Sequence, residues 1–437
     1  MEINADLHAH SGYAGGVGKI SLRKIDEMMS LKGIHIIGTG DCLHPGWLGY
    51  LRKNLKEDED GLFTFEEMET KFLLQTEVIL TSDVGMGRKS VHTVVLFPSL
   101  DAVEQVCRKM EKWGVKNTIG RPFMVCEDST DVSQKLYEFR DIDNKIEIIP
   151  AHVLTPDGIY GSNRPITYLH EFFGDFSDEI RGIETGLSAD PHILHHIPEL
   201  EERTWISNSD AHSHHLHRMG REFTTFEIQK LKYSQIVESI RKDKVVRTAE
   251  FHPAEGRYFF TGHRGNRKGH SGSHCYFSPE NVPDDHKCPI CLKKLTIGVF
   301  ERALTLRLNQ SRMEGNLSEI IKEDKIEGGK TRKFVTMIPL AEIIARGLEI
   351  QSATSKKVLK AYKEVVALVG SECDLWFMEK DAMEEVLKGM SEKIYTAIHC
   401  VKNGEFGFSP PGFDGEYGKL LLGECTTMAN VRVIYRP

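Results

Sequence analysis

Histidines and carboxylates recur directly after short apolar runs in the first half of the chain. His8-Ala9-His10 and Asp210-Ala211-His212 place two such side chains at alternate positions. Alternate side chains of a strand point to the same face, so each pair can contact one metal ion. Further candidate ligands at the ends of predicted strands are Asp41, Glu77, His92 and His152. Together these residues predict a polynuclear metal centre.

The chemistry that such a centre supports is hydrolysis of a phosphoester. Imidazole groups are common ligands of divalent transition metals. A carboxylate such as Glu77 can bridge two ions and bring them close enough to activate a shared hydroxide. We therefore interpret His8, His10, Glu77 and Asp210 as metal ligands that take part in catalysis.

Two further residues are candidates for the same site. Glu184, in Gly-Ile-Glu-Thr-Gly, ends another predicted strand and can bind a metal or orient a ligand histidine. An ion-paired structural carboxylate is the competing interpretation. Arg221 lies just beyond the last ligand pair, and its planar guanidinium group suits a phosphate. The alternative for Arg221 is an ion pair with a nearby carboxylate.

The elements that must position these residues alternate between strand and helix over residues 1–250. Ser21 can cap a helix that ends at Gly33, and a second helix is predicted near Asp101–Trp113. Because ligands follow nearly every strand, a closed α/β barrel explains their convergence better than an open, doubly wound sheet. The predicted strands are Ile34–Thr39, Phe72–Leu80, Val91–Phe97, Ile146–Ile149, Ile180–Ile183, Thr204–Ile206 and Val245–Thr248.

A small metal-stapled module is predicted over residues 251–314. Cys288-Pro289-Ile290-Cys291 can supply two thiolates to a tetrahedral Zn²⁺, and Cys275 lies upstream at a spacing normal for zinc ribbons. The fourth ligand is open among His263, His270 and His274. We prefer His263 and His270, because His274 adjoins Cys275. Free buried cysteines are the alternative, in a segment too polar to build its own core.

Basic and aromatic residues are interleaved around this module. The mixture suits a phosphate backbone and stacking of an exposed base, although Tyr258 and its neighbouring phenylalanines can equally form a buried strand. A phosphoesterase joined to a zinc module makes nucleic acid the leading substrate. The candidate DNA-binding residues are Arg257, Arg264, Arg267 and Lys268.

Length, charge and cysteine usage set broader limits. The chain has 437 residues and a formal net charge of −8, so we expect two or three domains of an ordinary globular protein. Nine scattered cysteines argue against a disulfide framework and favour a reducing cytoplasm. No apolar run approaches the roughly 18 residues of a membrane span. A polar linker, Gly315–Arg332, leads to a helical domain predicted over residues 315–437.

The motifs of the first 250 residues resemble, in order, those of the polymerase-and-histidinol-phosphatase (PHP) superfamily. The resemblance implies a distorted seven-stranded β/α barrel with two or three divalent metals (Zn, Mn or Mg). It implies one metal at His8, His10, Glu77 and Asp210, a second at Glu77, His92 and His152, and a third at Asp41 and His212. Many members have Thr-Asp-His where this chain has Thr39-Gly40-Asp41, which leaves Cys42 and His44 as further candidates for the third site.

Nearly the whole chain resembles the endonuclease Q family. The likeness rests on the motifs that contain Asp6, Asp41, Glu184, Asp210 and Arg221, on Cys-Pro-x-Cys, and on Pro411-Gly412-Phe413-Asp414-Gly415. Gly265–Ser273 looks like an insertion ahead of Cys275. The family implies a PHP barrel, a zinc-binding domain and a helical C-terminal domain. Its members nick DNA on the 5′ side of uracil, hypoxanthine, xanthine and abasic sites.

The resulting expectation is a metal-dependent repair endonuclease. We expect it to flip the damaged nucleotide out of duplex DNA, to act as a monomer without a membrane, and to work in the cytoplasm. A sliding clamp is kept as a candidate partner, although no clamp-binding motif is evident. The alternatives are a small-molecule phosphatase of the histidinol-phosphatase kind and a non-catalytic DNA-binding protein.

Overall fold

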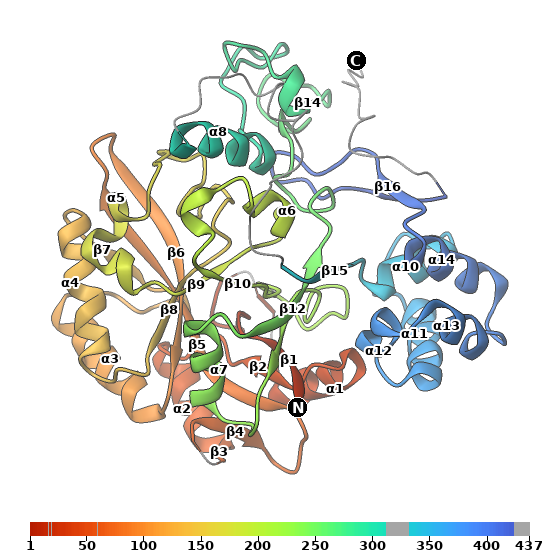
Figure 1. Cartoon of the computed structure of the whole chain (residues 1–437), viewed down its shortest axis with the longest axis horizontal. Helices are drawn as coiled ribbons and strands as arrows, with labels where there is room; N and C mark the ends of the chain where they lie inside the picture. The colour runs from red at the N-terminus through yellow and green to blue at the C-terminus, as the bar shows by residue number, and fades with distance from the viewer. Residues whose placement is uncertain (16, 19, 59, 312–331, 424–437) are drawn as a thin grey trace.

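A mixed eleven-stranded sheet forms the centre of the molecule (Figure 1). The computed structural model describes residues 1–437 except 16, 19, 59, 312–331 and 424–437. The main path of the sheet runs β15-β12-β11-β1-β2-β5-β4-β3, and β6, β7 and β8 extend it from β5. The first eight strands are β1 (Glu2–Asp6), β2 (Ile36–Gly38), β3 (Leu55–Glu57), β4 (Leu62–Phe65), β5 (Lys71–Asp83), β6 (Arg88–Phe97), β7 (Phe123–Val125) and β8 (Glu147–Pro150).

The remaining strands bring the chain back toward β1. A parallel pair, β9 (Gly182–Glu184) and β10 (Thr204–Ile206), lies between β8 and β12. β12 (Val245–Phe251) pairs with β11 (Phe223–Glu227), which in turn pairs antiparallel with β1. The order of neighbours therefore leads from β1 around through β5, β8 and β12 and back to β1.

The predicted α/β class is confirmed, but the sheet is less regular than the sequence suggested. β1 pairs parallel with β2, and β2 parallel with β5. β5 and β6, by contrast, form a long antiparallel hairpin, and β6 pairs antiparallel with β8. The prediction that Glu77 and His92 end their strands is wrong, because both lie in the middle of this hairpin. The hairpin therefore continues past Glu77 and His92 to its turn after Asp83.

Helices cover the outside of the sheet where the sequence pattern placed them. α1 (Leu22–Lys32) is capped by Ser21, whose side chain accepts a hydrogen bond from the Lys24 backbone N–H, and it ends at Gly33 with φ of 81°. The helix predicted near Asp101–Trp113 is observed as α3 (Leu100–Lys112). The other helices of this half are α2 (Pro45–Asn54), α4 (Ser129–Arg140), α5 (His170–Phe173), α6 (Pro191–Leu194) and α7 (Tyr233–Arg241).

The second half adds a small hairpin module and a helical lobe. β13 (Thr261–His263) and β14 (Cys275–Phe277) pair antiparallel, and α8 (Val299–Ser311) follows them. β15 (Phe334–Met337) then joins the central sheet beside β12. The predicted linker, Gly315–Arg332, lies almost entirely outside the described residues.

The C-terminal helices form the lobe drawn in blue in Figure 1. They are α10 (Leu340–Gly347), α11 (Lys356–Val369), α12 (Glu372–Phe377), α13 (Lys380–Val386) and α14 (Glu392–Lys402). The hairpin of β16 (Phe406–Phe408) and β17 (Leu420–Leu422) connects this lobe to the module above the sheet. Among the described residues, none of the helices has both the length and the apolar surface needed to cross a bilayer.

Candidate metal centres and active-site cavity

His8 and His10 follow β1 and point into the centre of the molecule. The imidazole of His8 is completely buried, and its Nδ1 lies 3.1 Å from Glu184 Oε1. The other nitrogen, Nε2, lies 3.8 Å from Glu77 Oε1 and 3.5 Å from Asp210 Oδ1. Glu184 therefore fixes the orientation of the ring and leaves Nε2 facing the other carboxylates.

His10 is held in the same manner by a different carboxylate. Its Nδ1 lies 3.1 Å from Asp41 Oδ1, and its Nε2 lies 3.0 Å from Asp210 Oδ1 and 3.6 Å from Glu77 Oε2. His8, His10 and Asp210 thus bring three ligand atoms within 4.8 Å of one another. Metal-binding histidines ordinarily have such a carboxylate on the nitrogen that does not bind the ion.

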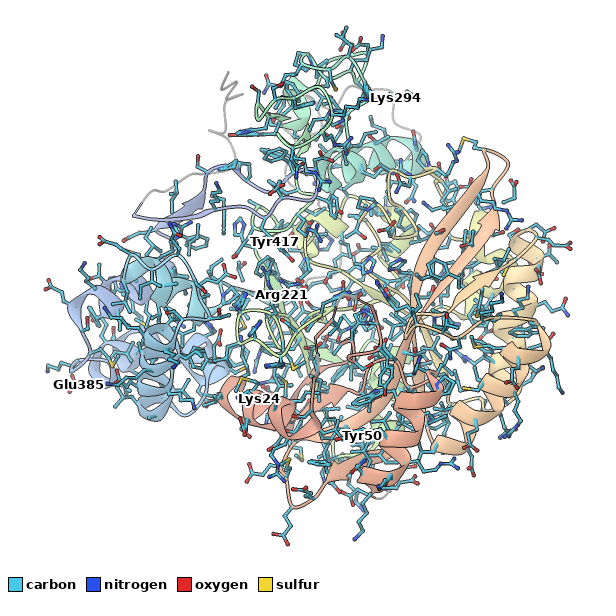
Figure 2. All side chains as sticks on the ribbon, turned by 180° about the vertical axis from the view of Figure 1, so that it is seen from behind. Lys24, Tyr50, Arg221, Lys294, Glu385 and Tyr417 are labelled. Carbon is cyan, nitrogen blue, oxygen red and sulfur yellow. The ribbon has the colours of Figure 1, made fainter. Side chains whose placement is uncertain are left out.

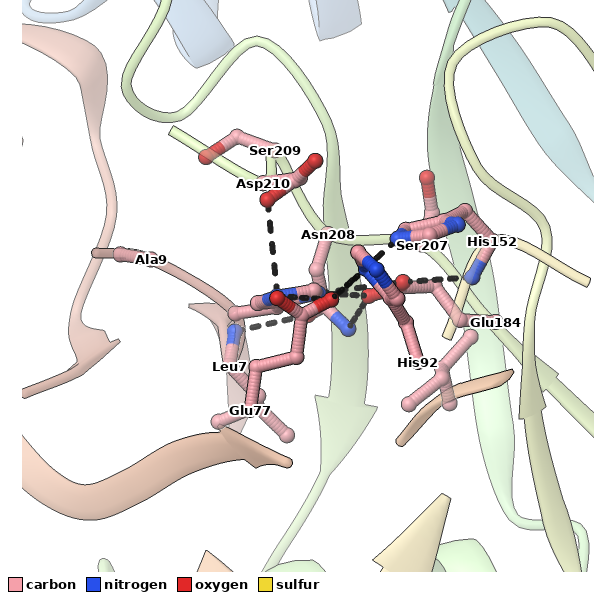
Figure 3. A network of polar contacts seen from close by, with 12 residues as sticks. Leu7, Ala9, Glu77, His92, His152, Glu184, Ser207, Asn208, Ser209 and Asp210 are labelled. Atoms are coloured by element: carbon pink, nitrogen blue, oxygen red, sulfur yellow. Dashed lines mark hydrogen bonds and ion pairs between the residues drawn. The ribbon is translucent and has the colours of Figure 1, made fainter. Parts of the chain in front are cut away.

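A second cluster consists of Glu77, His92 and His152, next to the first (Figure 3). Glu77 Oε1 lies 2.6 Å from His92 Nδ1 and 3.4 Å from His152 Nε2. The other nitrogen of His152 contacts Thr155 Oγ1 at 2.6 Å, which fixes its ring. Glu77 is therefore placed between two groups of potential ligands, as a carboxylate that bridges two ions must be.

Two buried atoms test whether these residues suit divalent ions. His8 Nε2 and Glu77 Oε2 are buried and have no hydrogen-bond partner. A buried polar atom without a partner costs free energy, and both atoms face the point where the clusters meet. Their donor types, imidazole nitrogen and carboxylate oxygen, are those that zinc and manganese accept. The residues fit divalent metals.

The charges of the two clusters reinforce one another. Burial alone would lower the pKa of His10, but its hydrogen bonds to Asp210 and Asp41 raise it to about 10. Burial likewise opposes protonation of His152, while Glu77 and the other carboxylates raise its pKa to about 9. The histidines in turn hold the pKa of Glu77 and of Asp210 well below the ordinary range, against the effect of burial. The carboxylates thus favour positive charge at this position, as a divalent ion would supply.

The backbone around the ligands is bent into the left-handed region. Asp41, His152 and Asp210 have φ angles of 46°, 30° and 46°, which residues other than glycine seldom adopt. Gly186 lies directly against His152, since a Cβ atom on Gly186 would come 2.4 Å from that of His152. Strain of this kind is concentrated where function requires a fixed geometry.

The residues assigned to a third metal are not grouped in this way. Asp41 Oδ2 accepts hydrogen bonds from the backbone and hydroxyl of Ser11, while its Oδ1 holds His10. His212 Nδ1 donates to the Asp210 carbonyl, and its side chain is 42% exposed. Among the described residues, Asp41, Cys42, His44 and His212 belong to none of the clusters that could hold a metal. Asp41 acts on His10 instead.

A cavity of about 450 Å³ opens beside the two clusters. His92, His152 and Asp210 line one side. Arg221 lines it too: its side chain is 3% exposed, and Nη2 donates to the Ser209 carbonyl at 3.2 Å. Its Nε and Nη1 are buried without a hydrogen-bond partner, so Arg221 has donors left for a ligand oxygen.

Several lining residues escaped the sequence analysis. Arg121 lies 3.8 Å from Glu77 Oε2, and Arg218 lines the cavity from the loop that follows Asp210. Tyr417 enters from the C-terminal hairpin, far along the chain. A loop arginine or tyrosine gives no periodic signal, although the proximity of Arg218 to Asp210 in the sequence was a usable hint. Further residues that line the cavity are Thr155, Ser188 and Asn208.

The module above the sheet gathers the predicted zinc ligands. His263, His270, Cys288 and Cys291 place ligand atoms within 4.8 Å of one another. Cys275 Sγ lies 3.6 Å from Cys288 Sγ. Burial raises the pKa of Cys288, but backbone N–H groups of Cys291 and Ile290 outweigh it and lower the pKa below that of an ordinary thiol. A thiolate is the form that binds zinc.

His274 is not part of this cluster. Its ring lies 5.5 Å from that of Phe413 and 6.0 Å from that of Tyr276. The preference for His263 and His270 over His274 therefore agrees with the geometry. The group of two histidines and two cysteines has the four ligands that tetrahedral zinc accepts, and Cys275, which was also predicted as a ligand, is outside it.

The predicted DNA-binding residues are in different situations. Arg257 lines the cavity, and Lys268 is exposed on the module. Arg267 forms an ion pair with Asp414, and the backbone N–H of Arg264 donates to the same carboxylate at 2.8 Å. Phe259 and Phe260 are buried, so of the aromatic run only Tyr258 reaches the cavity.

Comparisons with known proteins extend over the full chain. No family model matches it. It is 28% identical over 287 residues to the uncharacterized protein MJ0043 of Methanocaldococcus jannaschii, a match that covers 63% of this chain and 33% of that protein. It is 25% identical over 440 residues to the uncharacterized protein YqxK of Bacillus subtilis, covering 96% and 99% of the two chains.

Two solved structures have the same fold throughout. One is the lesion-specific endonuclease PfuEndoQ of Pyrococcus furiosus, with a TM-score of 0.76, 29% identity, and coverage of 99% of this chain and 98% of that chain. The other is an endonuclease Q in complex with a 27-mer duplex that has an abasic lesion at the active site, with a TM-score of 0.79, 28% identity, and coverage of 99% and 100%. Over nearly its whole length the chain resembles these endonuclease Q structures.

Proposed function

We propose that this protein is a DNA repair endonuclease that nicks the phosphodiester on the 5′ side of deaminated bases and abasic sites. The observation that carries the proposal is the full-length likeness to a lesion-specific endonuclease and to a complex with abasic DNA. The two ligand clusters and the arginine-lined cavity supply the chemistry that this activity needs.

The proposed reaction is hydrolysis at the two clusters. Divalent ions held by His8, His10 and Asp210 and by Glu77, His92 and His152 would polarise the phosphate and supply hydroxide at neutral pH. Asp41 and Glu184 keep the His10 and His8 rings turned toward that position. Arg221 lines the same cavity and has donors free for an oxygen of the substrate.

The cavity supports extrusion of the damaged nucleotide. Its lining comes from the sheet, from Arg257 and Tyr258 next to the module, and from Tyr417 of the C-terminal hairpin. A lesion that pairs poorly costs less to flip out of the duplex than a normal base, which favours damaged sites. We propose residues 1–250 as the PHP barrel, 251–314 as the zinc module and 315–437 as the C-terminal domain.

A nicking assay tests the proposal. End-labelled duplexes with one uracil, hypoxanthine or abasic site are incubated with protein and Mg²⁺, Mn²⁺ or Zn²⁺, and the nick position is mapped. We expect metal-dependent cutting directly 5′ of the lesion. Absence of a nick with every ion, or an equal rate on undamaged duplex, would contradict the proposal.

Variants locate the activity in the two clusters. His8→Ala and Asp210→Ala each remove a ligand and should lower the nicking rate by at least about a hundredfold. His399→Ala is the matched control, because His399 pairs with Glu384 in the helical lobe and is far from the cavity. Unchanged rates for both ligand variants would mean that the clusters are not the catalytic site.

A further inference from the structure

Tyr417 lies at the centre of a group of arginines that line the cavity. The guanidinium carbon of Arg218 is 4.2 Å from the centre of its ring, that of Arg257 is 5.5 Å away, and that of Arg221 is 6.0 Å away. All four residues line the same cavity. Figure 2 shows Arg221 and Tyr417 close together in the middle of the molecule, beside the C-terminal lobe.

The positive charge of this group has no direct counter-ion. Within the described part of the chain, none of the three guanidinium groups forms an ion pair with a carboxylate. Arg257 Nε donates to the Gly415 carbonyl at 2.8 Å, and Arg221 Nη2 to that of Ser209. Nη1 of Arg218 and Nε and Nη1 of Arg221 are buried without a partner. Unpaired donors of this kind are costly unless a ligand meets them.

The electrostatic effect of the group is visible on Tyr417 itself. Burial raises the pKa of a phenol, yet Arg221, Arg218 and Arg257 lower the pKa of Tyr417 below its ordinary value. Burial and the neighbouring Arg221 lower the pKa of Arg218. Burial opposes the charge of Arg221, but Tyr417, Glu222 and Asp210 raise its pKa, so Arg221 stays charged and its free donors can meet an anion in the cavity.

We propose that Arg218, Arg221 and Arg257, held around the ring of Tyr417, form a second phosphate site that takes the phosphodiester on the 3′ side of the extruded nucleotide. This inference rests on the proposed function. A nucleotide flipped out of a duplex has a phosphate on each side, and only the 5′ one is cut. With the 5′ phosphate at the metal clusters, the 3′ phosphate lies elsewhere in the same cavity, and the arginine group offers forked donors for it.

Tyr417 is the positioning residue of this site. An arginine that stacks on an aromatic face gains attraction from the ring and loses freedom to turn away. Because Tyr417 comes from the C-terminal hairpin while Arg218 and Arg221 come from the loop before β11, the ring joins distant parts of the chain at the substrate. The hydroxyl also interacts with Arg221, and the ring is the part that the arginines stack against.

A neutral phosphate analogue tests the assignment. Lesion duplexes are made with a methylphosphonate in place of the phosphate 3′ of the lesion, and the full-length protein is assayed for binding and for single-turnover nicking. We expect the wild-type protein to bind this duplex roughly ten- to a hundredfold more weakly than the unmodified one. Arg218→Ala and Arg257→Ala should bind unmodified DNA more weakly but lose little further affinity on the analogue.

Controls separate this result from a general loss of charge. Lys388→Ala removes an exposed lysine of the helical lobe and should behave as the wild type on both duplexes. A methylphosphonate several nucleotides from the lesion should weaken wild type and Arg218→Ala by the same factor. If the wild type and both arginine variants lose affinity for the 3′ analogue by the same factor, the phosphate site is overturned. A finding that these arginines contact only the extruded base would overturn it as well.

The role of Tyr417 has its own comparison. Tyr417→Phe keeps the ring and should retain most of the sensitivity to the 3′ analogue, whereas Tyr417→Leu should lose it as the arginine variants do. Full sensitivity in Tyr417→Leu would contradict the positioning role. If the wild-type protein fails to nick unmodified lesion DNA, the proposed function is at fault instead.

Discussion

At the scale of single residues, the metal clusters depend on carboxylates that hold the ligand histidines. Glu184 is the clearest case. It is buried, contacts His8 Nδ1, and accepts hydrogen bonds from Asn208 Nδ2 at 2.9 Å and from the His152 backbone N–H at 2.8 Å. Glu184 therefore helps to orient His8 of one cluster and His152 of the other, and it does not itself lie between the two clusters.

Replacement of this carboxylate should weaken metal binding while all proposed ligands remain. Glu184→Gln removes the negative charge beside His8, and such changes typically cost ten- to a hundredfold in metal affinity or activity. Titration of the protein with metal in a calorimeter measures the change in affinity. Glu147→Gln is the matched control: Glu147 is equally buried but bonds to Arg241, so it should lower stability and leave metal affinity unchanged.

A second buried carboxylate gives a pH dependence of stability. Burial raises the pKa of Glu250 to about 8, although Thr185 and Ser207 donate hydrogen bonds that oppose the shift. The folded protein thus keeps a proton that the unfolded chain releases above its ordinary pKa. The associated stability is present below that ordinary pKa and is lost as the pH rises toward 8.

The wild-type protein should therefore be less stable toward urea at pH 8 than at pH 5. The slope due to Glu250 is at most about 1.4 kcal/mol per pH unit. Glu250→Gln resembles the protonated form and should flatten the profile relative to wild type. Parallel profiles for the two proteins would show that Glu250 does not carry the shift.

At the scale of elements, a buried ion pair connects the first helix to the C-terminal lobe. Lys32, the last residue of α1, lies 2.8 Å from Glu372 of α12, and both side chains are fully buried. Glu372 also accepts hydrogen bonds from the Tyr362 hydroxyl and the Leu340 backbone N–H. The pair thus joins α1 of the sheet half to three helices of the lobe.

Loss of one partner should be costly because the other charge stays buried. Lys32→Met should lower the free energy of unfolding by about 3 kcal/mol or more. Lys24→Met on the same helix removes an exposed lysine that pairs with Glu27, and it should cost less than about 1 kcal/mol. Urea denaturation of both variants measures the difference, and equal small losses would show that the buried pair adds little.

At the scale of the whole molecule, the structure has two kinds of candidate metal site, which differ in ligand type. The clusters beside the sheet use imidazole and carboxylate, whereas the module uses imidazole and thiolate. Thiolates favour zinc, so the module should keep its ion when the other sites exchange.

Metal analysis of purified variants checks this separation. Cys288→Ser should lower the zinc content by about one ion per chain, while His274→Ala, the matched control outside the cluster, should leave it unchanged. His8→Ala should reduce only the metal bound beside the sheet. The same loss of ions in Cys288→Ser and His8→Ala would mean that the sites are not independent.

The sequence by itself determined the ligand types, the α/β class and most helices, because these follow from local spacing. His-x-His at a strand end, capping by Ser21 and the stop at Gly33 need only neighbouring residues to be recognised. The Cys-x-x-Cys motif likewise predicts a pair of thiolate ligands. The likeness to endonuclease Q was also contained in such motifs, and the solved structures confirm it.

Only the tertiary structure decided how these residues are used. It placed Glu77 and His92 within a long hairpin, turned Asp41 toward His10, and brought Tyr417 to Arg218 across about half the chain. Such choices depend on which strands become neighbours and on how a loop packs from far away. The local sequence shows which chemical groups are present. The fold of the whole chain decides which residue each group contacts.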